Sequence, residues 1–311
     1  MKRRLPGIVA VWGSLLALGG AGCEDQHVVI GVTAPGQGGG GGSGGGAGGA
    51  AGAPELPAFE APTAVTEINS DAREEDPTLT GDLLEIYFMS DRDGDRDIWT
   101  SRREALGSPW DPPHAVENIN QAGIAEDTPS VSDAGLRLWF YSAREPAGIW
   151  RAERASRDEP WGAPVHVDTL AVPETEVMSP HVDSSELHVA VGLRGPSTAG
   201  WDLAIATRER PDDDWGALAP LSELNGPDDE HAPFLFDDRR QILFRSGGDL
   251  LWARRPRADA AFEQAAPLAE PVNLSDARDT DPYLSPDGSV LFFASTRSGV
   301  ADIYEARRAA P

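Results

Sequence analysis

Short apolar segments recur along the chain between residues 85 and 294, each followed by a turn and a second apolar segment. The first segments are rich in β-branched and aromatic residues and are too short for buried helices. They span residues 85–89, 137–141, 187–191, 241–244 and 290–294. The second segments are centred on residues 97–99, 148–150, 202–204, 250–252 and 302–304. This pattern predicts β-hairpins that repeat with a constant spacing.

Two further landmarks share the period of these hairpins. A proline that follows acidic residues recurs at intervals of 52, 51, 53 and 49 residues, at Pro77, Pro129, Pro180, Pro233 and Pro282. An aromatic residue recurs at intervals of 51, 51, 54 and 47 residues, at Phe59, Trp110, Trp161, Trp215 and Phe262. The first aromatic landmark precedes the first proline, so the chain begins with the last strand of a repeat. An open solenoid would need atypical capping repeats, whereas this circular offset predicts an all-β, five-bladed β-propeller closed by its N-terminal strand.

The last repeat carries the clearest family signature. It contains Asp281-Pro282-Tyr283 with Ser285-Pro286-Asp287-Gly288, then Ser295-Thr296-Arg297 and Asp302-Ile303-Tyr304. This order resembles the PD40 (WD40-like) repeat of TolB-like propeller proteins, and the resemblance covers residues 59–311. The third repeat departs from it with Gly192 in place of serine, and the fourth lacks the turn arginine. The resemblance implies an extracytoplasmic protein, although TolB has six blades and an additional domain.

The N-terminal segment predicts export. Basic residues at positions 2–4, an apolar run over residues 5–18 and small residues before Cys23 are typical of a signal peptide of the lipoprotein type, residues 1–22. Cys23 would then be lipidated, although Gly20 stands where a lipobox usually has leucine; the alternative is ordinary cleavage that leaves a free thiol. Residues 23–58 include a run of glycine and alanine that predicts a disordered tether.

Charge and composition limit the classes of partner that the protein can bind. Without the leader, the chain has 23 cationic and 51 acidic residues, a formal net charge of −28. Such a surface repels nucleic acid and anionic lipid, so contact with a membrane is expected only through the lipid anchor. Lys2 is the only lysine, which excludes Schiff-base and phosphate-loop lysines from the mature protein. The six histidines lack the spacing of a zinc site or of a hydrolytic triad.

One candidate site follows from the repeat itself. An acidic residue precedes each landmark proline, and an arginine recurs in the turn after four of the apolar segments. The acids are Glu74, Glu126, Glu176, Glu230 and Asp279; the arginines are Arg92, Arg144, Arg194 and Arg297. These residues are candidates for a ring in the central funnel that binds a ligand or a cation, or that cleaves glycans with two carboxylates as glycosidases do. The alternative is structural, with each acid paired to an arginine or to backbone amides.

A second candidate is an acidic turn. Asp91, Asp93, Asp95 and Asp97 alternate around Gly94 and offer the oxygen ligands that calcium prefers. A solvated acidic loop is the alternative, because the spacing lacks the distal glutamate of an EF-hand. No other cofactor is expected.

The sequence therefore predicts a monomeric propeller over residues 59–311, anchored to a bacterial membrane and facing the periplasm or the cell surface. Its expected function is recognition of an envelope protein or glycan through the propeller loops and funnel, without catalysis. The enzymatic alternative is a glycoside hydrolase that uses funnel carboxylates.

Overall fold

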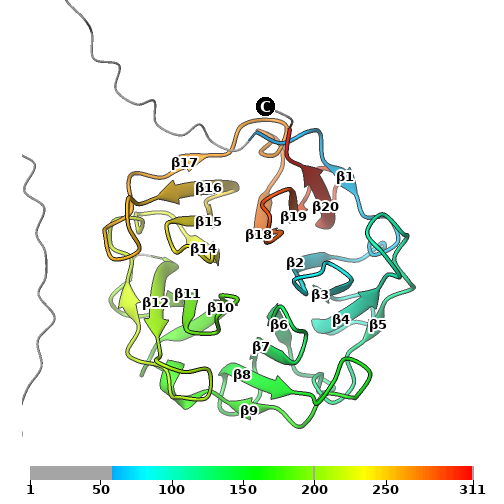
Figure 1. Ribbon diagram of the computed structural model, residues 1–311, viewed down its shortest axis with the longest axis horizontal. Coiled ribbons are helices and arrows are strands. Elements are labelled where there is room, and N and C mark those ends of the chain that lie inside the picture. Colours follow the sequence, from blue (N-terminus) through cyan, green and yellow to red (C-terminus); the bar gives the residue numbers. More distant parts are fainter. Residues whose placement is uncertain (1–57, 199, 310–311) are drawn as a thin grey trace, which may run out of the picture. The chain divides into compact units, whose positions relative to one another are not determined.

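The computed structural model describes residues 58–198 and 200–309, which form five four-stranded antiparallel sheets around one axis (Figure 1). The innermost strands are β2 (Glu74–Leu79), β6 (Glu126–Val131), β10 (Glu176–Val182), β14 (Glu230–Leu235) and β18 (Asp279–Leu284). The second strands are β3 (Glu85–Ser90), β7 (Arg137–Ser142), β11 (His188–Arg194), β15 (Gln241–Ser246) and β19 (Val290–Ser295). The third strands are β4 (Asp97–Arg102), β8 (Gly148–Glu153), β12 (Asp202–Thr207), β16 (Asp249–Arg254) and β20 (Asp302–Arg307).

The outermost strands are two residues long. They are β1 (Thr63–Ala64), β5 (His114–Ala115), β9 (Val165–His166), β13 (Ala219–Pro220) and β17 (Ala266–Pro267). The one helical element in the described part of the chain is a 3-10 turn, η1 (Asp168–Leu170). The sheets are numbered here as blades one to five, beginning with the blade that contains β2.

The N-terminal strand closes the ring. β1 pairs with β20 in register Thr63 to Glu305 and Ala64 to Tyr304, and a bridge joins Phe59 to Arg308. Beyond the strand, the side chain of Asn69 donates to the carbonyl of Ile303 at 2.9 Å and accepts from its N–H at 2.8 Å. The fifth blade is therefore built from both ends of the described chain, and the predicted five-bladed propeller closed by its N-terminal strand is confirmed.

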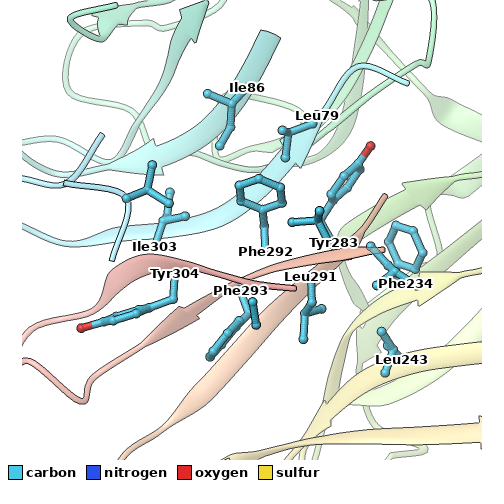
Figure 2. Packing of buried hydrophobic residues seen from close by; sticks show 14 of the residues in the cluster. Leu79, Ile86, Phe234, Leu243, Tyr283, Leu291, Phe292, Phe293, Ile303 and Tyr304 are labelled. Carbon is cyan, nitrogen blue, oxygen red and sulfur yellow. The ribbon is translucent and has the colours of Figure 1, made fainter. Parts of the chain in front are cut away.

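The second strands are almost wholly buried because each sheet packs between two others. All six residues of β3 and of β19 are buried. Figure 2 shows Phe292 of β19 and Ile303 of β20 directed toward Leu79 and Ile86 of blade one, all four fully buried. Apolar side chains thus alternate between the two faces of one blade, as a strand with period two requires.

The repeated aromatic landmarks are held by arginines. An arginine just after the third strand lies over the ring of the aromatic residue that follows, with 4.3 Å from Arg103 to Trp110 and 4.4 Å from Arg154 to Trp161. Blade three repeats this contact at 4.0 Å and blade four at 4.3 Å, through the pairs Arg208–Trp215 and Arg255–Phe262. Cation–π contacts of this kind attach the outer loop to the blade where the fourth strand is short.

The predicted signal peptide, Cys23 and almost all of the tether lie outside the described residues. In residues 58–198 and 200–309, no helix is long and apolar enough to span a membrane.

Candidate functional site

The axis of the propeller is narrow and lined by the residue before and the residue after each landmark proline. Each inner strand has a bulge here, with a left-handed residue before the proline: Asp76, Thr128, Ser179, Ala232 and Asp281, with φ between 48° and 56°. A left-handed residue before proline is disfavoured, so the fold imposes this conformation at all five positions. The cavity between them has a volume of about 40 Å³, which is enough for a water molecule but not for a sugar or a peptide.

The residue after the proline joins neighbouring blades, but not at every interface. Thr78 Oγ1 accepts from the N–H of Val131 at 3.3 Å, and Ser130 Oγ accepts from the N–H of Val182 at 3.2 Å. His181 Nδ1 accepts from the N–H of Leu235 at 3.2 Å. Blades four and five carry aromatic residues at this position instead, and within the described residues neither side chain accepts from a backbone N–H of the next blade.

Those rings are Phe234 and Tyr283, which pack edge to face at 5.5 Å. They form the floor of a much larger cavity of about 860 Å³. The cavity begins at the axis, where Thr78, Ser130 and His181 reach it, and extends outward between blades four and five past Trp252 to Arg308. We call it the funnel cavity. Its volume is within the range of about 300–1,000 Å³ that is typical of ligand sites.

The inner part of the funnel cavity is acidic. Asp133 and Asp237, from the turns after β6 and β14, line it. Burial, followed by the charges of Asp237 and Asp183, raises the pKa of Asp133. Burial lowers the pKa of His181 to about 4, so this imidazole is neutral at pH 7. With Nδ1 accepting a backbone hydrogen bond, the proton of the neutral ring lies on Nε2.

A different group of acids lies at the opposite end of the axis. The carboxyl of Asp76 is within hydrogen-bonding reach of Asp127 and Asp281, and burial together with the charges of these two neighbours raises the pKa of Asp76 well above its usual range. Asp127 also meets Arg96 at 2.5 Å. Burial and the charge of Asp281 raise the pKa of Glu75 to about 7. These side chains share protons rather than carrying four negative charges.

The predicted ring of acids and arginines does not line the funnel; its acids lie within the blades instead. Glu74, Glu126 and Asp279 have fully buried side chains inside the blades, 2.9, 2.8 and 2.8 Å from Arg92, Arg144 and Arg297 respectively. The acids also accept from backbone N–H groups, as Glu126 does from Gln121 at 2.9 Å. None of these residues lines the axial cavity or the funnel cavity. A buried carboxylate needs a partner, and each repeat supplies one within its own sheet.

The remaining two blades vary this pattern. Glu230 has no turn arginine and accepts instead from Gly226 N–H at 2.8 Å and Ser246 Oγ at 3.0 Å. The pair of Glu176 and Arg194, at 2.7 Å, is largely exposed. Gly192 of the same blade lies against the His231 ring, whose Cδ2 would be 2.6 Å from an added Cβ, so a serine cannot replace it without a shift.

The four aspartates of the acidic turn do not form a calcium site. Asp91 pairs with Arg73 at 2.8 Å, and Asp95 accepts from the N–H of Gly123 at 2.9 Å. Asp93 extends into solvent, and Asp97 begins β4. No group of three or more His, Cys, Asp and Glu side chains within the described ranges is arranged to hold a metal ion. The carboxylates of Asp91 and Asp95 are held by separate contacts, to Arg73 and to Gly123.

Sequence reasoning missed the residues that line both cavities. Asp76, Asp281 and Tyr283 all lie within the proline motif, next to the landmark prolines. The signal in the sequence that could have identified them is variation, because the positions next to the proline differ from repeat to repeat. Residues that break the repeat distinguish one blade from another, and they are the ones that shape the site.

Comparison with known proteins is consistent with this fold. No family model and no curated protein matches the sequence. Among solved structures, an α-L-arabinofuranosidase from Podospora anserina aligns with a TM-score of 0.58 at 9% identity, covering 82% of this chain and 99% of that one. An endo-arabinase from Bacteroides thetaiotaomicron VPI-5482 aligns with a TM-score of 0.56 at 13% identity, covering 81% and 98%.

TolB from Acinetobacter baumannii is also similar, with a TM-score of 0.48 at 13% identity over 78% of this chain. The chain spans 56% of the length of that protein. At these identities the likeness shows the fold alone. A shared fold does not imply a shared function, so function must be argued from the site.

Proposed function

We propose that the chain is an exported, lipid-anchored binding protein of the PD40 type that recognises an envelope ligand in the funnel cavity. The observation that carries this proposal is the cavity of about 860 Å³ between blades four and five. Its floor is aromatic, its rim is polar, and the rigid inner strands position both. These are the usual features of a recognition site built on a scaffold.

A cavity-filling variant tests the proposal. Ser184 lies exposed on the rim of the funnel cavity, so Ser184→Trp fills the mouth without touching the core. Ser275, exposed in the loop before β18 on the opposite face, provides the matched control Ser275→Trp. Mature wild-type protein and the Ser275→Trp variant should retain the same envelope component in pull-downs, and Ser184→Trp should lose it. Equal retention by all three proteins would refute a ligand site in this cavity.

A glycoside hydrolase is the second candidate, favoured by one observation. Glu75, with its pKa near 7, could act as a general acid at neutral pH, next to carboxylates in unlike surroundings. Two features oppose it. Asp76 is within hydrogen-bonding reach of its neighbours, whereas glycosidase carboxyls are about 5–10 Å apart to hold the glycosidic bond between them. The adjacent axial cavity of about 40 Å³ is also too small for a sugar ring.

Hydrolysis assays separate the two candidates. If Glu75 were a general acid, Glu75→Gln would lower arabinan or aryl-glycoside hydrolysis by about 10²–10⁴-fold, while Glu67→Gln, at an exposed glutamate near β1, would not. We expect no turnover by the wild-type protein. Turnover that disappears in Glu75→Gln alone would replace the binding proposal by the enzymatic one.

A further inference from the structure

Acidic and basic side chains both line the funnel cavity. The acids Asp133 and Asp237 come from turns at the ends of inner strands, whereas Arg254 and Arg308 come from the ends of third strands, farther out. Arg254 is paired with Glu263 at 2.9 Å, whereas the guanidinium of Arg308 has no hydrogen-bonding or ionic partner in the described part of the chain. Other charged residues line the cavity as well, namely Asp238, Arg240, Arg255, Glu263 and Asp287, so both signs of charge occur away from the axis.

The two central acids are not neutralised by salt bridges. Among residues 58–198 and 200–309, Asp133 and Asp237 have no ion-pair partner, and Asp237 accepts one backbone hydrogen bond, from Ser184 N–H at 3.0 Å. Arg157 donates to the backbone carbonyl of Asp133 at 3.2 Å, but its ionic partner is Asp82 at 2.7 Å. Both carboxylates are exposed to solvent and therefore open to pairing with a positive group of a ligand.

Tyr283 adds an independent observation. Its side chain is 6% exposed, it lines both cavities, and its hydroxyl has no hydrogen-bond partner among the described residues. Its ring is buried but its hydroxyl oxygen remains accessible, so the hydroxyl can bond a ligand in the cavity. Burial, followed by the charges of Asp133, Asp237 and Asp82, raises the pKa of Tyr283.

The backbone provides a further unfilled position. Leu284 lines the cavity and is equivalent to Val131, Val182 and Leu235 of the other blades. Each of those three residues donates its backbone N–H to a side chain of the preceding blade. Phe234 has no acceptor atom for the N–H of Leu284. A ligand that enters between blades four and five can accept this hydrogen bond.

We propose that the funnel cavity binds a ligand with a cationic guanidinium or alkylammonium head, held by Asp133 and Asp237 above the rings of Tyr283 and Phe234. The ring faces stabilise the cation, and the Tyr283 hydroxyl takes part in its hydrogen bonding. An acceptor or anionic group farther along the ligand meets Leu284 N–H and Arg308. This inference rests on the proposed function and names the ligand chemistry of the same cavity.

Calorimetry on the mature full-length protein tests the head group. N-acetyl-L-arginine carries a guanidinium and a carboxylate, and N-acetyl-L-citrulline replaces the guanidinium by a neutral urea of nearly the same shape. We expect the arginine derivative to bind at least ten times more tightly than the citrulline derivative. Equal affinity of the two compounds would overturn the proposal.

Variants assign the binding to the named residues. The double variant Asp133→Asn/Asp237→Asn keeps an acceptor oxygen for Ser184 N–H and should weaken binding of N-acetyl-L-arginine by more than tenfold. Tyr283→Phe should weaken it by about threefold or more without loss of the ring packing. The control Asp276→Asn removes one exposed charge on the opposite face and should change binding by less than twofold. An unchanged affinity in the double variant would refute the assignment.

Two further probes distinguish the source of the cation. Spermidine represents a free polyamine, and an Ala-Arg-Ala-type peptide represents a basic side chain of a protein. Tighter binding of one of these two probes identifies the source of the cation. If neither probe binds, and the arginine and citrulline derivatives do not bind either, the proposal of a cationic ligand is refuted. If the pull-down still depends on Ser184 in that case, the binding function stands and only its ligand chemistry fails.

Discussion

The carboxylate of Glu126 meets the guanidinium of Arg144 at 2.8 Å inside blade two, and its side chain is completely buried. Glu176 and Arg194 form the corresponding pair of blade three at 2.7 Å, but their side chains are 34% and 55% exposed. One repeat motif thus provides a buried and an exposed ion pair in the same chain.

These two pairs predict different costs of losing the arginine. Arg144→Leu leaves a buried carboxylate without its cation and should lower the free energy of unfolding by about 3–5 kcal/mol. Arg194→Leu should cost about 1 kcal/mol or less, because water already solvates Glu176. Urea denaturation measures both. Similar losses in the two variants would show that burial does not set the strength of the pair.

Closure of the ring depends on Asn69. Its side chain makes two hydrogen bonds to Ile303, which is 234 residues away along the sequence. Asn69→Ala leaves the N–H and the carbonyl of Ile303 without these partners and should lower the free energy of unfolding by about 2–3 kcal/mol. Asn225→Ala removes the same two contacts within one blade, to Leu203, and provides a matched comparison. A loss below about 0.5 kcal/mol for Asn69→Ala would contradict the role in closure.

The acids at the end of the axis predict a pH dependence of stability. The pKa of Glu75 is raised to about 7, so the folded protein holds this proton more tightly than the unfolded chain does. Its contribution to stability is complete below about pH 4.3 and is lost as the pH rises through about 7. In Glu75→Gln the side chain stays neutral throughout.

The free energy of unfolding of Glu75→Gln should therefore rise relative to wild type by on the order of 2 kcal/mol between about pH 4.5 and pH 8. Denaturant unfolding at several pH values measures this difference, with Glu67→Gln as the exposed control. A difference between Glu75→Gln and wild type that does not change with pH would contradict the raised pKa.

Two arginines that both stack on a tryptophan differ in whether they also form a close ion pair. Arg154 lies over Trp161 and is 2.6 Å from buried Glu85, whereas Arg208 lies over Trp215 and its closest carboxylate, Glu186, is 3.9 Å away. Burial lowers the pKa of Arg208 to about 10, consistent with a poorly compensated charge.

Methionine preserves the length and apolar packing of either side chain. Arg154→Met should lower the free energy of unfolding by about 3 kcal/mol because Glu85 loses a buried partner, and Arg208→Met should cost about 1 kcal/mol. Thermal and urea unfolding of the two variants would reveal the difference. If Arg208→Met were the more damaging variant, stacking on tryptophan would outweigh ion pairing in this fold.

The repeat was readable from the sequence because each blade uses the same local devices. Period-two apolar segments, the landmark prolines and the aromatic landmarks all reflect contacts within one blade or between adjacent blades, so they recur about every 50 residues. The order of the first aromatic landmark and the first proline was enough to predict closure by the N-terminal strand. Cys23, the leader and the tether remain predictions.

The site was not readable in the same way. The acids that recur in every repeat were assigned to the funnel, but the fold buries most of them inside the blades, where a repeated charge needs a repeated partner. The funnel cavity arises where the repeat is broken, at Phe234 and Tyr283, and its charges come from different radial layers of several blades. Sequence determined the blade, because a blade is held by contacts local in the chain. Only the closed ring decided which side chains face the axis, because that depends on residues about 50 to 230 positions apart meeting in space.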